Sequence, residues 1–384
     1  MYGLFFKEFN FQNNLTFNFK LNKMTTNSKN GKSLSRRKFL GTTAVAASSV
    51  FFVPSLFGRE GYTAQQKISK PNSKFGGVQI GAITYSWRDM PGGVENIIKY
   101  CQEAGVSSIE LMSNDLEMYL GAPQNPFMRQ PGQQPAAPPN PPAPPANMPA
   151  GAPPAGGQRP QRTPEQEAAI TKYNQELKAW RTSLPMSKVE QAKKLFNDAG
   201  ISVHIVKFSP ARWSDEEIDY AFRVAKAMGA KGVTEEIGEE AVKKLAPFAE
   251  KNKSYAIFHN HMQFATPGFT YDNFLNVSPA VMMNFDAGHF FGSTGIHPNE
   301  IIKKYHDRIA SIHIKDKTGP KSNPPNTNTE WGKGETPIAD VLLLLKKEKW
   351  PINVDIELEY PIPQGSDSVK EVKKCIEFCR KILA

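Results

Sequence analysis

The residues best suited to chemistry are an acid and an imidazole three positions apart, Asp286 and His289, in the stretch Asp286-Ala287-Gly288-His289. They follow the apolar run Val281-Met282-Met283, which is typical of a buried parallel strand whose carboxyl end carries polar side chains. Taken alone, the stretch favours a simpler explanation, an Asp that caps the next helix with a His packed beside it. Its meaning depends on whether other strands end in the same way.

Other apolar runs in the second half of the chain also end in polar residues. These are Glu236, His259, His261, His313, Lys315, Asp316, Glu357 and Glu359. If the runs are parallel strands of one barrel, their ends meet at one mouth. Oxygen and nitrogen ligands without cysteine suit one divalent ion, Mn²⁺, Co²⁺, Zn²⁺ or Mg²⁺. The competing explanation is structural, with Glu236 and Glu357 paired to Lys207 or Lys315 and His313 satisfied in the core.

An alternation of strand and helix patterns that begins at residue 76 must position these side chains. Eight strand-then-helix units with right-handed crossovers predict an α/β fold, a closed (β/α)8 TIM barrel. Strands are expected at residues 78–85, 107–112, 201–208, 232–236, 255–261, 281–286, 309–314 and 354–358. Helices are expected at residues 94–104, 165–199, 215–228, 239–251, 271–275, 298–305, 338–348 and 368–383. A doubly wound sheet would need a glycine-rich first loop, and Thr84-Tyr85-Ser86-Trp87-Arg88 is not one.

The barrel is expected to be a single domain over residues 76–384, with an insertion at residues 122–162 after its second strand. The insertion consists mainly of Pro, Ala, Gly and Gln, which cannot bury enough apolar surface to offset the entropy lost on ordering. We therefore predict a disordered or polyproline surface loop there.

Residues 1–65 are read as an N-terminal extension that carries an export signal. Arg36 and Arg37 precede the small, apolar segment 41–53, a pattern that resembles a twin-arginine signal. The segment is too short for a stable membrane span, so we expect no span in the mature protein. The prediction is export through the twin-arginine machinery to the periplasm, starting from Met1 or Met24. A basic turn before a buried helix is the alternative.

The charge balance argues against nucleic acid as a partner. The whole chain has a net charge of +10, but residues 1–60 hold nine Lys/Arg and only two acids, which leaves +3 for the rest. So small a surplus does not predict a general phosphate-binding surface. The three cysteines, Cys101, Cys375 and Cys379, form neither a disulfide framework nor a thiolate metal site and are read as packing residues.

Several of these motifs together resemble the xylose-isomerase-like barrel superfamily, and within it the sugar phosphate isomerase/epimerase branch. They are Asp286-Ala287-Gly288-His289, Ile312-His313-Ile314-Lys315-Asp316, His259-Asn260-His261, Ile356-Glu357, Ile83-Thr84-Tyr85-Ser86-Trp87-Arg88 and Ser108-Ile109-Glu110-Leu111. The resemblance implies that Asp286, His313 and Glu357 hold the metal. It also implies an acid on the fifth strand, where this chain has His259. Glu236 and His261 are then the expected further ligands.

The remaining roles follow from the chemistry that such a site invites. Proton abstraction beside a carbonyl needs a base, for which Glu357 or His289 are the candidates. Lys207 and Lys315 would steady substrate oxygens. The expected substrate-binding residues are Tyr85, Trp87, His204, Trp213 and His259, with ordinary core packing as the alternative for the three aromatic residues.

The predicted function is a metal-dependent sugar isomerase or epimerase that acts through an enediolate on a small carbohydrate. One alternative uses the same intermediate to expel a leaving group, which gives a lyase or hydrolase of 3-keto-glycosides. Another is a non-catalytic periplasmic sugar-binding protein. Metal-dependent phosphodiester cleavage ranks third, because it would want more ligands and a more basic surface. A homo-oligomer is compatible with the sequence.

Overall fold

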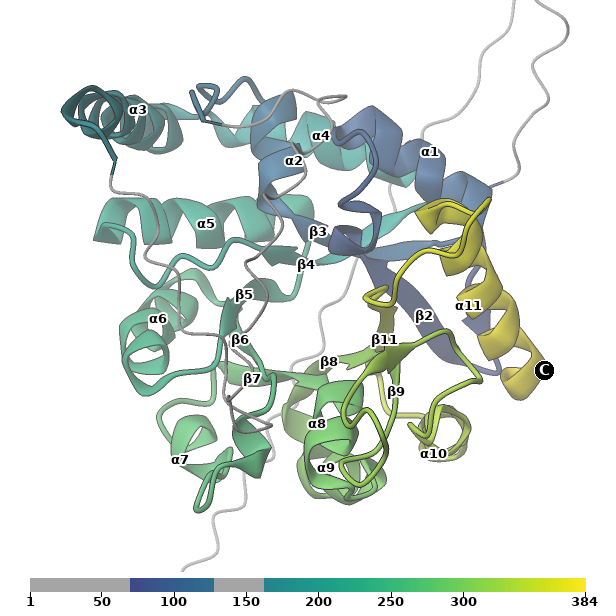
Figure 1. The fold of residues 1–384 in the computed structure, drawn as a ribbon. Coiled ribbons are helices and arrows are strands. Elements are labelled where there is room, and N and C mark those ends of the chain that lie inside the picture. The colour runs from purple at the N-terminus through teal and green to yellow at the C-terminus, as the bar shows by residue number, and fades with distance from the viewer. Residues whose placement is uncertain (1–69, 128–161) are drawn as a thin grey trace, which may run out of the picture. The chain divides into compact units, whose positions relative to one another are not determined.

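The barrel is built from parallel strands that follow one another in sequence and in space. The computed structural model describes residues 70–127 and 162–384 (Figure 1). Its strands are β2 (Val78–Ile83), β3 (Ser108–Met112), β4 (Ser202–Lys207), β5 (Gly232–Glu236), β6 (Tyr255–His259), β7 (Val281–Asp286), β8 (Ile309–Ile314) and β11 (Asn353–Ile356). Each pairs in parallel with its neighbour, and the β2–β3 pairing closes the ring. The predicted eight-stranded (β/α)8 barrel is confirmed.

Helices surround the strands. They are α1 (Val94–Ala104), α2 (Ser113–Tyr119), α3 (Pro164–Ser183), α4 (Met186–Asp198), α5 (Asp215–Met228), α6 (Glu239–Asn252), α7 (Asp272–Leu275), α8 (Ala287–Thr294), α9 (Asn299–Tyr305), α10 (Ile338–Glu348) and α11 (Ser368–Leu383). Short additions are β1 (Lys74–Phe75), which pairs antiparallel with β2, and the hairpin of β9 (Asp316–Lys317) with β10 (Asn328–Thr329). None of the helices in the described ranges is long and apolar enough to cross a membrane.

Local sequence signals explain where the helices begin and end. The hydroxyl of Ser214 and the carboxylate of Glu217 form a capping box at the start of α5, and Gly229 ends that helix in the left-handed conformation. The predicted single helical stretch 165–199 is two helices instead. Pro185 explains the break, because the residue before a proline is disfavoured in the helical conformation and Leu184 is extended.

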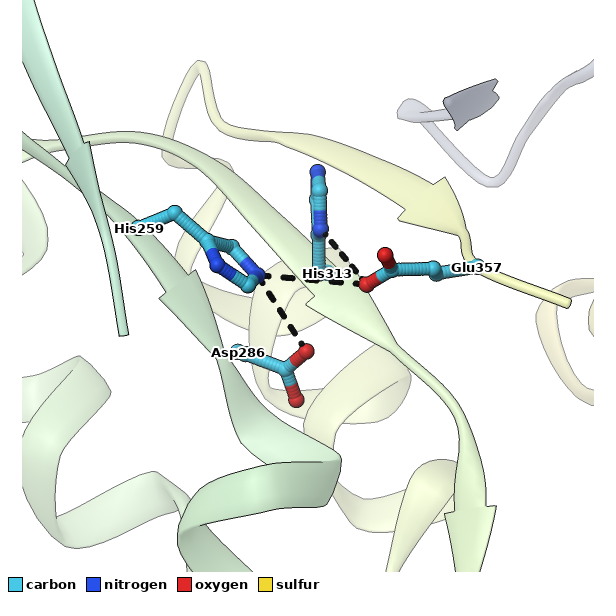
Figure 2. Close-up of side chains that lie close together, drawn as sticks. All are labelled: His259, Asp286, His313 and Glu357. Atoms are coloured by element: carbon cyan, nitrogen blue, oxygen red, sulfur yellow. Dashed lines mark hydrogen bonds and ion pairs between the residues drawn. The ribbon is translucent and has the colours of Figure 1, made fainter. Parts of the chain in front are cut away.

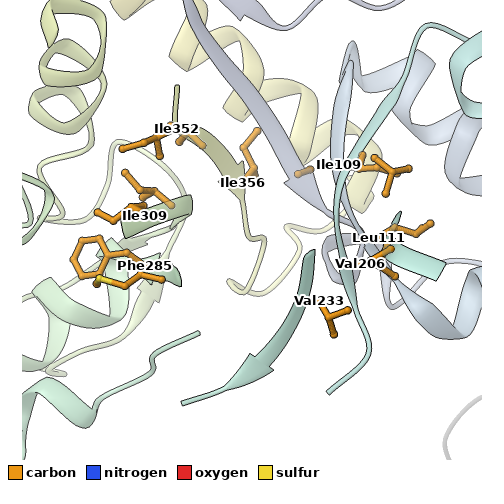
Figure 3. Close-up of a cluster of buried hydrophobic side chains, with 14 of the residues drawn as sticks. Ile109, Leu111, Val206, Val233, Phe285, Ile309, Ile352 and Ile356 are labelled. Carbon is orange, nitrogen blue, oxygen red and sulfur yellow. The ribbon is translucent and has the colours of Figure 1, made fainter. Parts of the chain in front are cut away.

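Polar and apolar side chains alternate along two strands that contribute to the site. On β3, the buried Ile109 and Leu111 alternate with Glu110, and on β7 Phe285 lies between two inward polar residues. The apolar side chains form the core between strands and helices (Figure 3). The polar side chains therefore face the barrel axis, where the site lies.

Residues 1–69 and 128–161 lie outside the described residues. The N-terminal extension with Arg36 and Arg37, and nearly all of the predicted insertion at 122–162, fall within these ranges. Export and the state of the insertion therefore stay predictions, as do the domain boundaries.

Candidate functional site

Four side chains from consecutive strands of the ring converge at the mouth of the barrel (Figure 2). His259 ends β6, Asp286 ends β7, His313 lies on β8, and Glu357 follows β11. Each offers one ligand atom, and these atoms all lie within 4.8 Å of one another. All four residues are buried. The structure thus brings together three of the predicted ligands, Asp286, His313 and Glu357, and adds His259, which was expected to bind substrate.

Two atoms of this cluster face each other without a hydrogen bond between them. Nε2 of His259 and Oδ2 of Asp286 are both buried and lie 3.4 Å apart. Oδ2 has the ammonium of Lys315 beside it at 2.9 Å, whereas Nε2 has no hydrogen-bond partner among the described residues. Leaving such a buried nitrogen unsatisfied costs about 1–3 kcal/mol. Two imidazoles and two carboxylates are a donor set that suits a divalent ion of the zinc or manganese type. The residues present therefore fit the metal that the sequence predicted.

Asp286 is both the cap of the next helix and a candidate metal ligand, the two roles considered for it from the sequence. Its Oδ1 accepts a 2.6 Å hydrogen bond from the backbone N–H of His289, which makes Asp286 the N-cap of α8. Its Oδ2 faces the cluster instead. The helix cap thus fixes the carboxylate so that its second oxygen points at the other candidate ligands.

A buried lysine compensates the carboxylates. Nζ of Lys315, which is 2% exposed, lies 2.9 Å from Asp286 Oδ2, 2.8 Å from Glu357 Oε2 and 2.7 Å from Glu359 Oε2. Burial alone would lower the pKa of Lys315, but the carboxylates raise it above its ordinary value. The ammonium is thus held by acids in this structure, rather than free for the substrate oxygens it was expected to steady.

Glu236 and His261 form a second group beside the first. Oε1 of Glu236 accepts a hydrogen bond from Lys207, and Oε2 lies 3.3 Å from Nδ1 of His259 and 3.5 Å from Nδ1 of His261. The side chains of Glu236 and His261 are 42% and 47% exposed. The predicted ligands are therefore divided between two groups that share His259. Lys207, like Lys315, is paired with an acid.

Two neutral imidazoles lie together at the mouth. The rings of His261 and His289 are 5.0 Å apart. Burial, helped by the charge of Lys315, lowers the pKa of His289 to about 4. Burial and the neighbouring His259 also lower the pKa of His261. Both rings are therefore held in the neutral form near neutral pH.

Sequence reasoning missed a layer of polar residues below the cluster. Oε2 of Glu110 on β3 lies 2.7 Å from Nε2 of His313 and accepts a hydrogen bond from Asn284. Burial would raise the pKa of Glu110, but the contact with His313 lowers it to about 2. The signal was a charged residue inside the apolar run Ile109-Glu110-Leu111, which a search of strand ends overlooks.

His204 lies at the opposite end of the barrel from its predicted position. Its ring lies 2.8 Å from Ser108 Oγ through Nδ1 and 2.8 Å from Asp355 Oδ2 through Nε2. It lines a cavity of about 320 Å³ together with Ser202 and Asn353, which are the first residues of their strands. The structure places His204 among residues at the amino ends of the strands, and the substrate contact stays a prediction.

Two of the three aromatic residues proposed as sugar platforms are used in packing. Trp87 is 2% exposed and packs against Tyr100. Trp213 has the guanidinium of Arg181 over its ring at 3.6 Å. Tyr85 is 39% exposed and has the guanidinium of Arg88 4.7 Å from its ring centre.

Asp316, which follows the candidate lysine by one residue, shapes the loop above the site. Its carboxylate accepts hydrogen bonds from the backbone N–H groups of Gly332, Gly334 and Thr336 at 2.8–3.2 Å. The acid in the His-Ile-Lys-Asp motif therefore closes the loop after β9.

Comparison with known proteins agrees with this architecture. Residues 173–382 match the family model described as xylose isomerase-like TIM barrel. No curated protein gives a significant match to the sequence.

Solved structures with a similar course of the chain include three enzymes. A probable 3-DHS dehydratase of Bacillus anthracis involved in petrobactin synthesis is 12% identical, with 78% of this chain and 98% of that chain covered and a TM-score of 0.49. A sugar phosphate isomerase/epimerase of Parabacteroides distasonis is 14% identical, with 78% and 95% covered and a TM-score of 0.45. D-psicose 3-epimerase of Clostridium cellulolyticum is 10% identical, with 80% and 99% covered and a TM-score of 0.49.

Proposed function

Because the chain belongs to the xylose isomerase-like TIM barrel family, we propose that it is a metal-dependent sugar isomerase or epimerase. His259, Asp286, His313 and Glu357 would hold one divalent ion, Mn²⁺, Co²⁺, Zn²⁺ or Mg²⁺. The observation that carries the proposal is the convergence of four buried ligand atoms within 4.8 Å of one another, among them His259 Nε2, which has no hydrogen-bond partner in the described residues. When bound, the ion would supply Lewis-acid polarisation of a substrate carbonyl or hydroxyl oxygen.

Glu357 and His289 are the two candidates for the base that moves the substrate proton. Glu357 is held by His313 and Lys315, and these contacts outweigh burial and keep its pKa well below the ordinary range. His289 is the better base, since its ring is neutral and its Nδ1 has no partner in the described residues. Nδ1 would take the proton from the carbon beside the carbonyl, which leaves an enediolate on the substrate. Return of a proton to the neighbouring carbon gives isomerisation, and return to the original carbon from the opposite face gives epimerisation.

A lyase acting on 3-keto-glycosides is the second candidate, and one observation favours it. The two neutral imidazoles, His261 and His289, lie side by side 5.0 Å apart. Epimerisation asks for acid and base groups on opposite faces of the substrate. On one side of the substrate, the ring that removes the proton becomes an imidazolium, which can then pass that proton to the leaving glycosidic oxygen, directly or through the other ring.

We also propose that the protein is exported to the periplasm by the twin-arginine machinery. Arg36 and Arg37 stand before an apolar segment without charges. Unphosphorylated carbohydrates would then be the accessible substrates. Replacement of both arginines by lysine is expected to retain the protein in the cytoplasm on cell fractionation. An unchanged periplasmic yield would contradict export by this route.

The experiment is incubation of the full chain with Mn²⁺ in heavy water, once with free ketoses and once with 3-keto-glycosides. Deuterium incorporated at carbon in an isomerised sugar supports the isomerase, and release of the aglycone supports the lyase. Sugar binding without either reaction supports a binding protein. The matched variant His289→Asn should lose both reactions but keep the metal. Absence of a stoichiometric divalent ion in the purified protein would overturn metal dependence.

A further inference from the structure

His259 presents one ring nitrogen to each of two acidic groups. Nε2 faces the metal cluster, at 3.4 Å from Asp286 Oδ2 and 3.8 Å from Glu357 Oε2. Nδ1 lies on the other side of the ring, 3.3 Å from Glu236 Oε2, at hydrogen-bond distance. The ring of His259 is buried, with 3% of its side chain exposed.

A histidine binds a metal as the neutral ring, and this geometry selects one tautomer of that form. A neutral imidazole carries its proton on one nitrogen and a lone pair on the other. With the proton on Nδ1, the ring donates to the carboxylate of Glu236 and aims the Nε2 lone pair at the cluster. In the opposite tautomer the lone pair of Nδ1 would face the carboxylate oxygen of Glu236, which is repulsive. Nε2 would then carry the proton and could not bind a metal.

The carboxylate of Glu236 is fixed by a second contact, on the side away from His259. Its other oxygen, Oε1, accepts a hydrogen bond from Lys207, whose side chain is mostly buried. Burial would lower the pKa of Lys207, but Glu236 outweighs this effect and raises it, so the lysine stays charged. Lys207, Glu236 and His259 thus form a chain of polar contacts from β4 through β5 to β6.

We propose that Glu236 is a positioning residue that fixes the tautomer and orientation of His259, so that His259 binds the divalent ion through Nε2. The inference rests on the proposed metal site and assigns Glu236 a role other than the direct ligation predicted from the sequence. It also accounts for the fifth strand, where the family resemblance implies an acid. In this chain the fifth strand supplies an imidazole, and the acid stands one strand earlier, behind the ring. Carboxylates in this position typically raise metal affinity 10–100-fold.

Two other arrangements use the same residues and make different predictions. If Glu236 were a direct ligand of the single ion, its loss would remove an oxygen ligand and leave the ring of His259 in place. If Glu236, His259 and His261 held a second ion, the chain would bind two ions rather than one. Stoichiometry and the number of bound nitrogens separate these arrangements.

The test is calorimetric titration of the full chain with Mn²⁺, for the wild type and the variants Glu236→Leu, Glu236→Gln and His261→Asn. We expect one ion per chain in all four. Glu236→Leu should weaken binding by about 10–100-fold. Glu236→Gln keeps an oxygen that accepts from Nδ1, so its affinity should fall between those of the wild type and Glu236→Leu. The matched control, Glu240→Gln on the exposed start of α6, should bind like the wild type.

Pulsed electron paramagnetic resonance of the bound Mn²⁺ counts the nitrogen ligands. This number should not change if Glu236 only stabilises the fold. Nitrogen couplings from two imidazoles are expected in the wild type and in His261→Asn. In Glu236→Leu the coupling from His259 should weaken or vanish, whereas Glu236→Gln should retain it. A thermal melt without metal checks that each variant is folded.

The outcomes separate this inference from the proposed function. A wild type that binds no Mn²⁺ overturns both. A wild type that binds one ion, with the affinity of Glu236→Leu within twofold of it, overturns the positioning role alone. Two ions in the wild type and one in His261→Asn would replace the positioning role with a second metal site.

Discussion

The ammonium nitrogen of Lys315 lies 2.9 Å from Oδ2 of Asp286, the oxygen proposed to face the metal. A divalent ion and this lysine therefore compete for the same negative charge. In Lys315→Met we expect Mn²⁺ to bind at least about tenfold more tightly, because a unit positive charge a few ångströms from the ion is removed. The metal-free variant should be less stable by about 3 kcal/mol, since buried carboxylates lose their partner. Calorimetry and urea unfolding with a chelator measure the two effects. Unchanged affinity would show that the lysine does not compete.

Glu357 and Glu359 offer a matched pair for testing the cluster. Glu357 belongs to the four-residue group, whereas Glu359 contacts Lys315 and His289 from outside it. Glu357→Gln should purify without stoichiometric metal and lose proton exchange with substrate by about 10³-fold, in line with the loss of a positioned electrostatic group. Glu359→Gln should keep the metal. Survival of both metal content and activity in Glu357→Gln would disprove the site.

A variant of His204 tests whether this residue contacts the substrate, as the sequence predicts, or only stabilises the barrel. It bonds Ser108 and Asp355 near the amino ends of the strands. We expect His204→Gln to lower the free energy of unfolding by about 2–4 kcal/mol, because two buried polar groups lose their partner. KM should not change for the substrate on which the wild type acts. A raised KM with unchanged stability would support the substrate contact predicted from the sequence.

Arg181 fastens α3 to its neighbours. Its guanidinium makes 2.8 and 2.9 Å hydrogen bonds to both oxygens of Glu117 and a 3.2 Å bond to Glu217, and it is almost fully buried. Arg181→Met should cost about 3–5 kcal/mol in urea unfolding, because the buried Glu117 loses its charged partner and Glu217 keeps only its contacts with Ser214. Lys178, on the same helix, pairs with Glu216 in solvent. The control Lys178→Met should cost less than about 1 kcal/mol.

Glu371 on α11, far from the site, should make the stability of the fold depend on pH. Burial would raise its pKa, but hydrogen bonds from Lys374, Ser366 and Tyr360 lower it below 4.5. A lowered folded-state pKa means that these bonds stabilise the fold above about pH 4.5 and are lost as pH falls through the folded value. Glu371→Gln should therefore be less stable than the wild type by about 1–3 kcal/mol at pH 7. That difference should shrink below pH 4.5, and a constant difference would contradict the assignment.

The fold could be predicted from the sequence because local signals agreed with the global pattern. The bounds of α1, α5, β5, β7 and β8 match the expected ranges residue for residue. The discrepancies have local causes. Pro185 divides one expected helix into α3 and α4, and α8 was missed because it begins directly at the cap Asp286 without an intervening loop.

For the site, the sequence predicted which residues stand at strand ends but not how their side chains are arranged. Sequence places a residue along a strand but does not reveal its height in the barrel. His204 stands three residues before Lys207 on β4, which is about 10 Å at 3.3 Å per residue, and this distance separates the two ends of the barrel. The division of roles between His259 and Glu236 depends on which ring nitrogen faces which neighbour. That orientation is set by packing between strands and leaves no mark in the sequence.

The last strand of the barrel, β11, pairs with both β8 and β2, so it joins the two edges of the sheet. The same short segment carries Asp355, which holds His204, and leads into Glu357 of the metal cluster. During synthesis, residues 353–357 leave the ribosome after all the other candidate ligands. A nascent chain that lacks them is an open sheet with an incomplete set of ligands, so closure of the ring and assembly of the metal site are the same event.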